Sequence, residues 1–280
     1  MKTYNKSSLN RAGKILAKPL SHLLANSVTE GITQMVEAYS GILLGKGAGS
    51  GWALTAEAKA AQSVIRHPRP VVFDVGANRG EWSLLLNKKY PHAQIFLFEP
   101  QPEFQNIIAE RRIAHFRLIP KAASENSGET VTLYTSEGVS GAASLHRRKD
   151  SYLKGREFTS IDVETIAIDD VVQEFNIERV DFMKMDIEGH EFNALKGAIK
   201  SLEGGVIKAL SFEFGSCNVN SRTYFRDYWD FLIPLRYKLY RILPSSRLMA
   251  IKDYYEDCEY FRGATNYVAM LSDLPRADRA

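Results

Sequence analysis

Runs of consecutive apolar residues alternate with helix-like segments along the chain from Val71 onward. Such runs are typical of strands that are buried on both faces of a sheet. They cover residues 71–75, 94–99, 116–120, 180–186 and 207–214. Helices are predicted between them, over residues 80–90, over residues 102–113 and from near Glu191. This β-α-β rhythm predicts an α/β fold with a parallel sheet and right-handed crossovers.

Two later parts of the chain depart from this rhythm. Between residues 123 and 166, the segments 130–134 and 159–164 alternate polar and apolar residues like half-exposed antiparallel strands. They predict an inserted hairpin region beside the main sheet. Residues 237–242 and 266–271 are suited to antiparallel strands at the edge of the sheet. The expected fold class is therefore α/β, with a mostly parallel sheet and an antiparallel closing strand.

The first 67 residues are predicted to be helical. Apolar residues recur at helical spacing in 15–24 and in 32–39, and a third helix is predicted over residues 54–66, after a glycine-rich segment at 45–51. We therefore divide the chain into a helical N-terminal extension, residues 1–67, and a sheet domain, residues 68–280. The extension is interpreted as a cap over an active site or a contact in a homo-oligomer, with a membrane-surface helix as a further alternative.

The composition of the chain argues against several kinds of partner and cellular compartment. The 280 residues include 36 Lys and Arg against 33 Asp and Glu, and a net charge of only +3 argues against a nucleic-acid-binding protein. A basic run at 146–149 is typical of a solvated loop, with contacts to a phosphate-bearing substrate as the alternative. Two cysteines are too few for a disulfide framework. Neither a run of about 18 apolar residues nor a secretory signal is recognised, so a cytoplasmic protein without a membrane span is expected.

A glycine-containing turn follows the first predicted strand, with the sequence Asp-Val-Gly-Ala-Asn-Arg-Gly at 74–80. Open α/β sheets bind ligands at the carboxyl ends of their strands, which makes this turn a candidate site. Gly76 would let the backbone pass close to a ligand, Gly80 would allow tight packing at the helix start, and Asp74 would orient the turn or reach the ligand. Asn78 replaces the middle glycine of a dinucleotide-binding G-x-G-x-x-G motif, so a ligand without a pyrophosphate, such as S-adenosylmethionine, fits this turn better.

Glu99 closes the second predicted strand, directly before Pro100. An acidic residue at this position can accept hydrogen bonds from both ribose hydroxyls of a nucleoside. A buried carboxylate is costly without donors, so Glu99 needs such partners. A glutamate that caps the next helix is the structural alternative.

Ionisable side chains are densest at 183–191, in the sequence Met-Lys-Met-Asp-Ile-Glu-Gly-His-Glu at the end of a predicted strand. Such a density at the carboxyl edge of a sheet is expensive unless the groups face a ligand cleft. Glu213 interrupts the next apolar strand and is expected to lie beside Asp186.

With these segments identified, the sequence resembles the FkbM-type methyltransferases. The resemblance extends over about residues 71–213, and its most specific part is the D-x-E-G-x-E sequence at 186–191. The other matching segments are 73–80, 98–100 and 141–145. The resemblance implies a Rossmann-like methyltransferase sheet, S-adenosylmethionine as the methyl donor, and O-methylation of a hydroxyl on a sugar, glycan or secondary metabolite. It also implies that residues 121–123 form the wall on the adenine side.

The candidate site combines residues from all of these segments. The candidate cofactor-binding residues are Asp74, Gly76, Asn78, Gly80, Glu99, Pro100, Ala122 and Asp186. Methyl transfer depends strongly on alignment of the two reactants, and a base near a poorly nucleophilic sugar hydroxyl should help. Asp186, His190 and Glu213 are the candidate catalytic residues, in no fixed order. Asp186 and Glu213 are alternatively ligands for a divalent cation, but two carboxylates are too few to require one, and no metal is expected.

Two other functional classes stay open. A nicotinamide-dependent oxidoreductase would use a similar sheet, but the incomplete glycine motif disfavours it. A non-catalytic nucleoside-binding protein could keep the same fold. The intact turn, Glu99 and the acidic cluster favour an enzyme that acts on a small-molecule or glycan hydroxyl.

Overall fold

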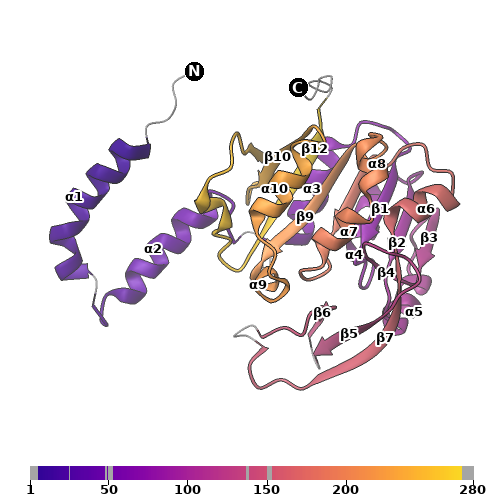
Figure 1. Cartoon of the computed structure of the whole chain (residues 1–280), viewed down its shortest axis with the longest axis horizontal. Helices are drawn as coiled ribbons and strands as arrows, with labels where there is room; N and C mark the ends of the chain where they lie inside the picture. The colour runs from indigo at the N-terminus through magenta and orange to yellow at the C-terminus, as the bar shows by residue number, and fades with distance from the viewer. Residues whose placement is uncertain are drawn as a thin grey trace. The chain divides into compact units, whose positions relative to one another are not determined.

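The computed structural model describes residues 6–24, 26–47, 49, 53–136, 139–149 and 153–272. These residues belong to two compact units, Met1–Leu44 and Gly45–Ala280. The first unit contains the helices α1 (Lys6–Leu24) and α2 (Glu30–Leu43), and all other elements belong to the second unit (Figure 1). Residues 48, 50 and 51 of the predicted glycine-rich segment lie outside the described residues. Within the described parts of the chain, no helix combines the length and the apolar character that a membrane crossing needs.

An eight-stranded sheet forms the centre of the second unit. Its strands are β1 (Val71–Val75), β2 (Gln94–Phe98), β3 (Phe116–Ile119), β8 (Phe182–Met185), β9 (Ala209–Gly215), β10 (Tyr237–Ile242), β11 (Leu248–Ala250) and β12 (Ala264–Leu271). They lie in the order β11-β10-β12-β9-β8-β1-β2-β3. The strands from β9 to β3 in this order pair in parallel, whereas β12 is antiparallel to both β9 and β10. The predicted Rossmann-like α/β class, mostly parallel with an antiparallel closing strand, is confirmed.

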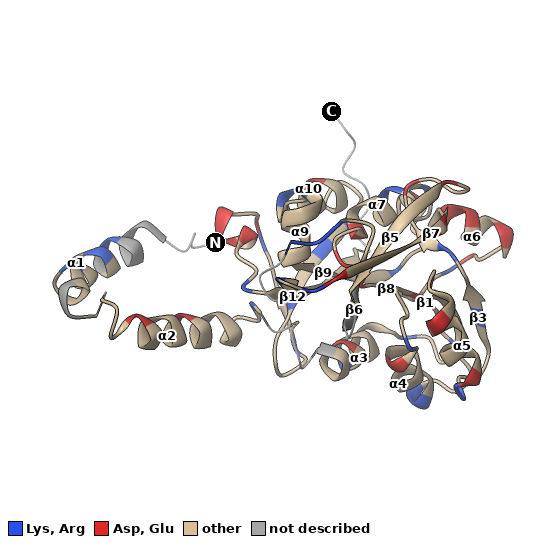
Figure 2. Cartoon of the chain, turned by 90° about the horizontal axis from the view of Figure 1, so that it is seen from below, with Lys and Arg blue, Asp and Glu red and all other residues tan. Residues whose placement is uncertain are grey.

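Helices cover both faces of this sheet (Figure 2). The helices on one face are α3 (Ala53–Val64), α4 (Glu81–Lys89) and α5 (Pro102–Glu110). Those on the other face are α6 (Ile168–Glu174), α7 (Glu191–Lys196), α8 (Ile199–Glu203) and α10 (Phe225–Leu232). Two further short helices are α9 (Ser216–Ser221) and the 3-10 helix η2 (Glu256–Glu259).

Strand β1 shows how the sequence produces these layers. Successive side chains of a strand point to opposite faces of the sheet. Val72 packs with Trp82 of α4 on one face, whereas Phe73 belongs to the cluster that contains Leu195 of α7 on the other. Because both faces are covered, β1 is apolar throughout except for Asp74, as expected for a doubly covered strand.

The region inserted after β3 forms a second sheet of four strands. They are β4 (Ala122–Ala123), β5 (Thr130–Ser136), β6 (Val139–Ser144) and β7 (Phe158–Ile166), in the order β4-β7-β5-β6. β5 and β7 pair antiparallel from Thr130–Glu164 to Ser136–Phe158, as their alternating patterns predict. The sequence does not predict β4, which pairs in parallel with β7, or the edge strand β6. The insertion is therefore a small sheet rather than a single hairpin.

Helix α3 belongs with the sheet rather than with the first two helices. Ala58 and Ala61 of α3 pack with Val72 in one buried cluster. Glu57 of α3 is also buried and accepts a hydrogen bond from the side-chain amide of Asn266 in β12. The division of the chain at residue 45 therefore differs from the domain boundary at residue 67 that the sequence analysis places after this helix.

Candidate active site

The turns that follow β1 and β2 contact each other at the carboxyl edge of the main sheet. β1 lies between β2 and β8, at the point where the strand order reverses and where open α/β sheets bind ligands. Glu99, only 2% exposed, accepts hydrogen bonds from the backbone N–H groups of Asn78 (2.8 Å) and Gln101 (2.9 Å) and from the Gln101 side-chain amide (3.3 Å). Burial raises the pKa of Glu99, and these donors partly offset the rise. Glu99 therefore fixes the two turns relative to each other.

Gly76 lies where the turn after β1 meets the end of β8. Its φ is +80°, and a Cβ at this position would overlap the carbonyl oxygen of Asp186. Only glycine satisfies both the backbone conformation and this contact. The close backbone approach predicted at Gly76 is therefore made with the protein's own chain, at the edge of the pocket described below.

A buried ionic group lies beneath this turn. The Lys184 ammonium nitrogen is 3.5 Å from an Asp74 carboxylate oxygen and 3.4 Å from one of Asp186. The second Asp74 oxygen accepts a hydrogen bond from Ser83 of α4 (2.6 Å). Burial alone would lower the pKa of Lys184, but Asp186, Asp74 and Glu57 outweigh it and raise the pKa. Lys184 therefore stays charged and links the carboxylates at the ends of β1 and β8.

These turns line a pocket with about 550 Å³ of empty space, part of it open to solvent. The lining residues from the main sheet and its turns are Gly76, Asn78, Phe98, Glu99, Pro100, Gln101, Asp186, Ile187, Glu188 and His190. The inserted region contributes the opposite wall, with Lys121, Ala122, Ala123, Leu133, Gly141, Ala143 and Leu145. The pocket therefore combines a polar floor with a largely apolar wall.

Three carboxylates meet at one end of the lining. Asp186, Glu188 and Glu213 each place an oxygen within 4.8 Å of the others. Burial raises the pKa of Glu213 well above its ordinary value, and the charges of Asp186 and Glu188 raise it further. A side-chain hydrogen bond between Glu213 and Asp186 favours the protonated form of Glu213 in the same direction. Carboxylate oxygens also suit a divalent cation, and the expectation that no metal is bound stays a prediction.

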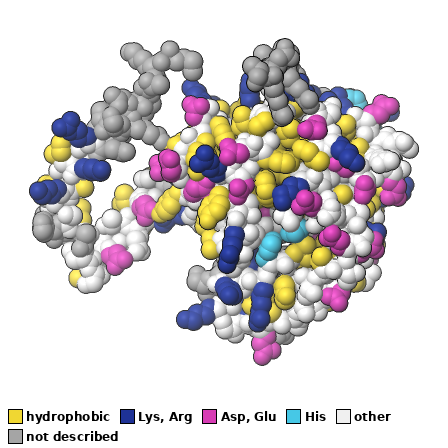
Figure 3. All heavy atoms as spheres, in the orientation of Figure 1, with side chains coloured by type: hydrophobic (Ala, Val, Ile, Leu, Met, Phe, Trp, Pro, Cys, Tyr) yellow, Lys and Arg dark blue, Asp and Glu magenta, His cyan; other side chains and the backbone are white. Residues whose placement is uncertain are grey.

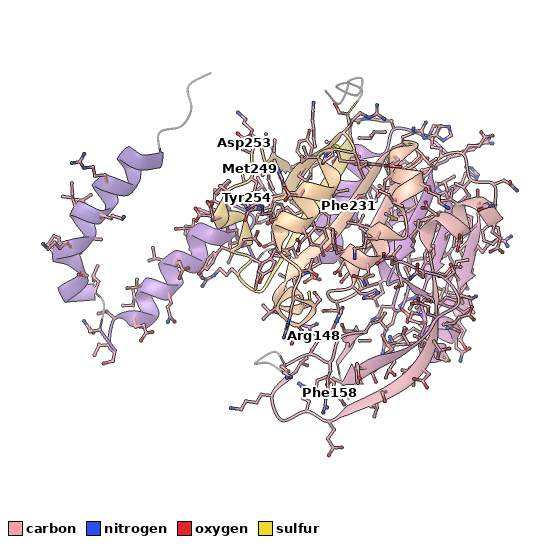
Figure 4. The ribbon with its side chains drawn as sticks, viewed as in Figure 1. Arg148, Phe158, Phe231, Met249, Asp253 and Tyr254 are labelled. Carbon is pink, nitrogen blue, oxygen red and sulfur yellow. The ribbon has the colours of Figure 1, made fainter. Side chains whose placement is uncertain are left out.

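Arg148 partly balances this acidic group. Its side chain, labelled in Figure 4, forms an ion pair with Glu188 and lies 3.4 Å from the Ser216 hydroxyl of α9. The arginine is 4% exposed, so the interpretation of the basic run as a solvated loop is wrong for Arg148, although Arg147 and Lys149 are exposed. Arg148 holds the basic run in place, because its buried guanidinium requires a partner and Glu188 supplies one.

His190 is buried in a histidine pair rather than exposed on the first turn of a helix. One ring nitrogen lies 3.0 Å from the Ser124 hydroxyl, and the other lies 3.3 Å from a ring nitrogen of His146. Burial lowers the pKa of His190 to about 4, with smaller contributions from His146 and Lys196. The imidazole is therefore neutral at physiological pH and engaged through both nitrogens.

The structure brings most of the candidate residues to one pocket. Those that line it are Gly76, Asn78, Glu99, Pro100, Ala122, Asp186 and His190. Three others lie behind the lining. Asp74 is fully buried under the turn, Gly80 packs against Ile108 and Ile113, and Glu213 reaches the pocket through Asp186. The roles assigned to all these residues stay predictions.

Several residues of the site are not among the sequence candidates. Lys184 interrupts an apolar strand, and that interruption is a signal that could have identified it. Glu191 accepts backbone hydrogen bonds from Ile187 (2.9 Å) and Gly189 (3.0 Å) and so shapes the turn after β8. Arg148 carried no such signal, because its partner Glu188 lies 40 positions away.

The chain is similar to known methyltransferases. A family model described as "Methyltransferase FkbM domain" matches residues 74–242. The methyltransferase sdnD of Sordaria araneosa is 28% identical over 155 residues, which are 46% of this chain and 60% of that relative. The 2-O-methyltransferase NoeI of Sinorhizobium fredii is 28% identical over 151 residues, 50% of this chain and 62% of the relative.

A third relative is the hexuronic acid methyltransferase AglP of Haloferax volcanii. It is 26% identical over 136 residues, which are 48% of this chain and 52% of that protein. The chain therefore spans between about half and three fifths of the length of these curated relatives.

Proposed function

The chain belongs to the FkbM methyltransferase family, and from that premise we propose that it transfers a methyl group from S-adenosylmethionine to a hydroxyl of a sugar-containing acceptor. Family membership identifies a methyltransferase, so the nicotinamide-dependent oxidoreductase and the non-catalytic binding protein are set aside. The names of two relatives, a 2-O-methyltransferase and a hexuronic acid methyltransferase, support a sugar hydroxyl as the acceptor.

The observation that carries the proposal is the environment of Glu99. A carboxylate can accept about four hydrogen bonds. Among the described residues, three donors use this capacity: the Asn78 N–H on one oxygen, and the backbone and side chain of Gln101 on the other. One acceptor position is left for a ribose hydroxyl, and a second follows if the long Gln101 side-chain bond is released. The lining therefore fits a nucleoside whose ribose faces Glu99.

The remaining lining suits the rest of such a cofactor. Ala122 and Leu133 offer the apolar surface that an adenine ring needs, and Gly76 and Asn78 present the turn after β1. When bound, S-adenosylmethionine supplies a methyl group activated by a sulfonium. The protein's contribution is to orient donor and acceptor in the pocket.

Asp186 is the group best placed to accept the proton that the acceptor hydroxyl loses. It lines the pocket, and its side chain is 36% exposed. Lys184, 3.4 Å from one of its oxygens, keeps this side chain in place. His190 is less suited to this role, because both of its nitrogens are engaged and its lowered pKa makes it a weak base.

The proposal is tested by incubating the full chain with isotopically labelled S-adenosylmethionine and a panel of acceptors. The panel contains nucleotide sugars, neutral oligosaccharides, uronic acids and polyketide alcohols. We expect label to appear on a sugar hydroxyl, located by mass spectrometry of the product. Binding of S-adenosylhomocysteine without transfer to any sugar, but with transfer to a polyketide, would overturn the acceptor class while keeping the cofactor.

A further inference from the structure

The apolar residues of α1 and α2 are exposed. All twelve large apolar side chains described between residues 15 and 44 have exposed fractions from 42% to 86%. They are Ile15, Leu16, Leu20, Leu24, Val28, Ile32, Met35, Val36, Tyr39, Ile42, Leu43 and Leu44. A group of exposed large apolar side chains in a folded protein marks an interaction site. The space-filling view shows separate yellow side chains on the visible face of the N-terminal unit, Met1–Leu44 (Figure 3).

In α1, the apolar and charged residues lie on opposite faces. At 3.6 residues per turn, Leu16 and Leu20 fall on one side of the helix, and Lys14 and Lys18 fall on the other. Arg11 and Ile15, four residues apart, lie next to each other at the border between the two sides, and the three basic residues are all exposed. The sequence of α1 contains no acidic residue, and the part of its ribbon that is not grey in Figure 2 is blue and tan. α1 is thus a basic amphipathic helix.

The excess positive charge of the chain is confined to this unit. Residues 1–44 contain five of the 36 Lys and Arg residues and two of the 33 Asp and Glu residues. The surplus is three charges here, equal to that of the whole chain, so residues 45–280 contain 31 of each sign and are neutral. The net positive charge that attracts an anionic surface therefore lies in the N-terminal unit.

We propose that α1 binds the surface of an anionic phospholipid bilayer, with Ile15, Leu16 and Leu20 inserted at the interface and Arg11, Lys14 and Lys18 among the headgroups. This geometry is that of an interfacial amphipathic helix, in which buried apolar area and attraction to anionic lipid act together. None of these residues lines the pocket, so the inference does not depend on the acceptor.

A second copy of the chain is the competing occupant. Helices that pair through their apolar faces turn their charged faces to solvent, where both signs are ordinarily mixed. In α1 only positive charges are present. Pairing between two copies of α1 gives no reason for a charged face of one sign. Each basic residue near an anionic bilayer adds affinity, so the unmixed charge favours the lipid surface.

The experiment is co-sedimentation of the full chain with vesicles. One set contains phosphatidylcholine alone, and the other contains phosphatidylcholine with phosphatidylglycerol. We expect binding to the anionic vesicles that weakens as salt is added. Lys14→Gln/Lys18→Gln should lower the partition coefficient by about 30-fold. Leu16→Ser/Leu20→Ser should abolish sedimentation with the anionic vesicles.

A matched control carries the same charge change elsewhere. Lys88→Gln/Lys89→Gln removes two exposed lysines from α4 and should bind like the wild type. Circular dichroism and the melting temperature check that every variant keeps the folded catalytic unit. Equal binding to neutral and anionic vesicles, or an equal loss in the control, would overturn the proposal. So would a dimer in analytical ultracentrifugation that Leu16→Ser/Leu20→Ser converts to a monomer without any vesicle binding, because the second copy would then be the occupant.

Discussion

Glu99 is the residue that most directly tests cofactor binding. Replacing it with Gln keeps the shape of the side chain but turns one acceptor oxygen into a donor, which would face an N–H group of Asn78 or Gln101. Hydrogen bonds to a charged group contribute more than neutral ones, so we expect Glu99→Gln to weaken S-adenosylhomocysteine binding about 10- to 100-fold. Isothermal titration calorimetry measures this. Glu103→Gln, at an exposed position on α5, is the control and should keep the wild-type affinity.

Asp186 tests the chemical step rather than cofactor binding. The neutral amide in Asp186→Asn cannot accept the proton, so we expect kcat to fall roughly 100-fold or more. The affinity for S-adenosylhomocysteine should change only a few-fold, because Glu99 and the turn after β1 are untouched. Steady-state kinetics and calorimetry separate the two effects. Asp230→Asn, on the exposed side of α10, should behave like the wild type. Full turnover in Asp186→Asn would remove Asp186 from the catalytic residues.

Gly76 and Gly128 have nearly the same positive φ, +80° and +78°, but different surroundings. A Cβ at Gly76 would overlap the Asp186 carbonyl, whereas nothing lies within 4 Å of one at Gly128. Gly128→Ala should therefore lower the unfolding free energy by about 1–2 kcal/mol, the cost of the backbone conformation alone. Gly76→Ala should cost clearly more, because the turn or β8 must also move. Urea denaturation of both variants makes the comparison, and equal losses would show that the close contact is unimportant.

The position of an individual residue was predictable from the sequence where a pattern in its neighbouring residues marked it. Gly76 and Glu99 stand directly after apolar strands, so their position at the carboxyl edge follows from the chain order alone. The ion pair of Arg148 with Glu188 and the histidine pair of His146 with His190 join distant segments, so no local pattern could reveal them. His190 was therefore a candidate base by residue type, whereas burial makes it a weak one.

Among the elements, the inserted sheet is the least firmly held part of the pocket. Its edge strand β6 pairs with β5 only at Tyr134–Ser144 and at Ser136–Val139, with an irregularity between them. Two contacts with Glu188 hold the carboxyl end of β6. The Ser144 hydroxyl donates a hydrogen bond to the Glu188 carbonyl (2.7 Å), and Arg148, which follows the strand, forms an ion pair with the Glu188 side chain. The wall thus depends on the same turn that contributes to the pocket floor.

Cofactor binding should therefore stabilise this wall. We expect S-adenosylhomocysteine to slow amide hydrogen exchange in residues 141–149, because a ligand that contacts Ala143 and Leu145 disfavours local opening. Exchange in the β10–β11 pair, which has no residue in the pocket, serves as the internal reference. Protection confined to the turns after β1 and β2 would contradict the assignment of β6 as a wall of the cofactor site.

Element boundaries show where sequence patterns lose information. The helix predicted from near Glu191 is two short helices, α7 and α8, separated at Gly197. A Cβ at Gly197 would overlap the Ser124 carbonyl, so the helix ends where the inserted region packs against it. The main strands were predictable because burial on both faces makes them uniformly apolar. The two-residue β4 was not, because such a short segment carries no periodicity.

At the scale of the whole molecule, α3 connects the chain before the sheet to the charged group under the pocket. Burial raises the pKa of Glu57 to about 7, Lys184 opposes the rise, and Asp186 and Asp74 add to it. The folded protein therefore holds a proton that the unfolded chain releases as the pH rises from 4.5 to 7. The contribution of Glu57 to the unfolding free energy therefore declines between pH 4.5 and pH 7 and is constant above pH 7.

Glu57→Gln removes this titration. We expect the unfolding free energy of the variant, relative to the wild type, to increase from pH 5 to pH 8, since only the wild type loses stability through the group. The Gln oxygen can still accept the bond from Asn266. Urea denaturation at the two pH values gives the difference, with Glu110→Gln at an exposed position of α5 as the control. Parallel pH profiles for Glu57→Gln and the wild type would contradict the prediction.

The pairing of β4 with β7 has a consequence for exchanging parts between relatives. Ala122 lies opposite Thr165, and Ala123 lies opposite Ile166. The inserted region therefore begins and ends at adjacent points of the catalytic unit. Residues 124–164 thus form a closed excursion that can be grafted from one family member to another at two neighbouring junctions. Such a chimaera would renew one side of the pocket while Gly76 and Glu99 keep their strands. The graft must also preserve the contacts of the excursion with Glu188, His190 and Gly197, where donor and host have to be matched.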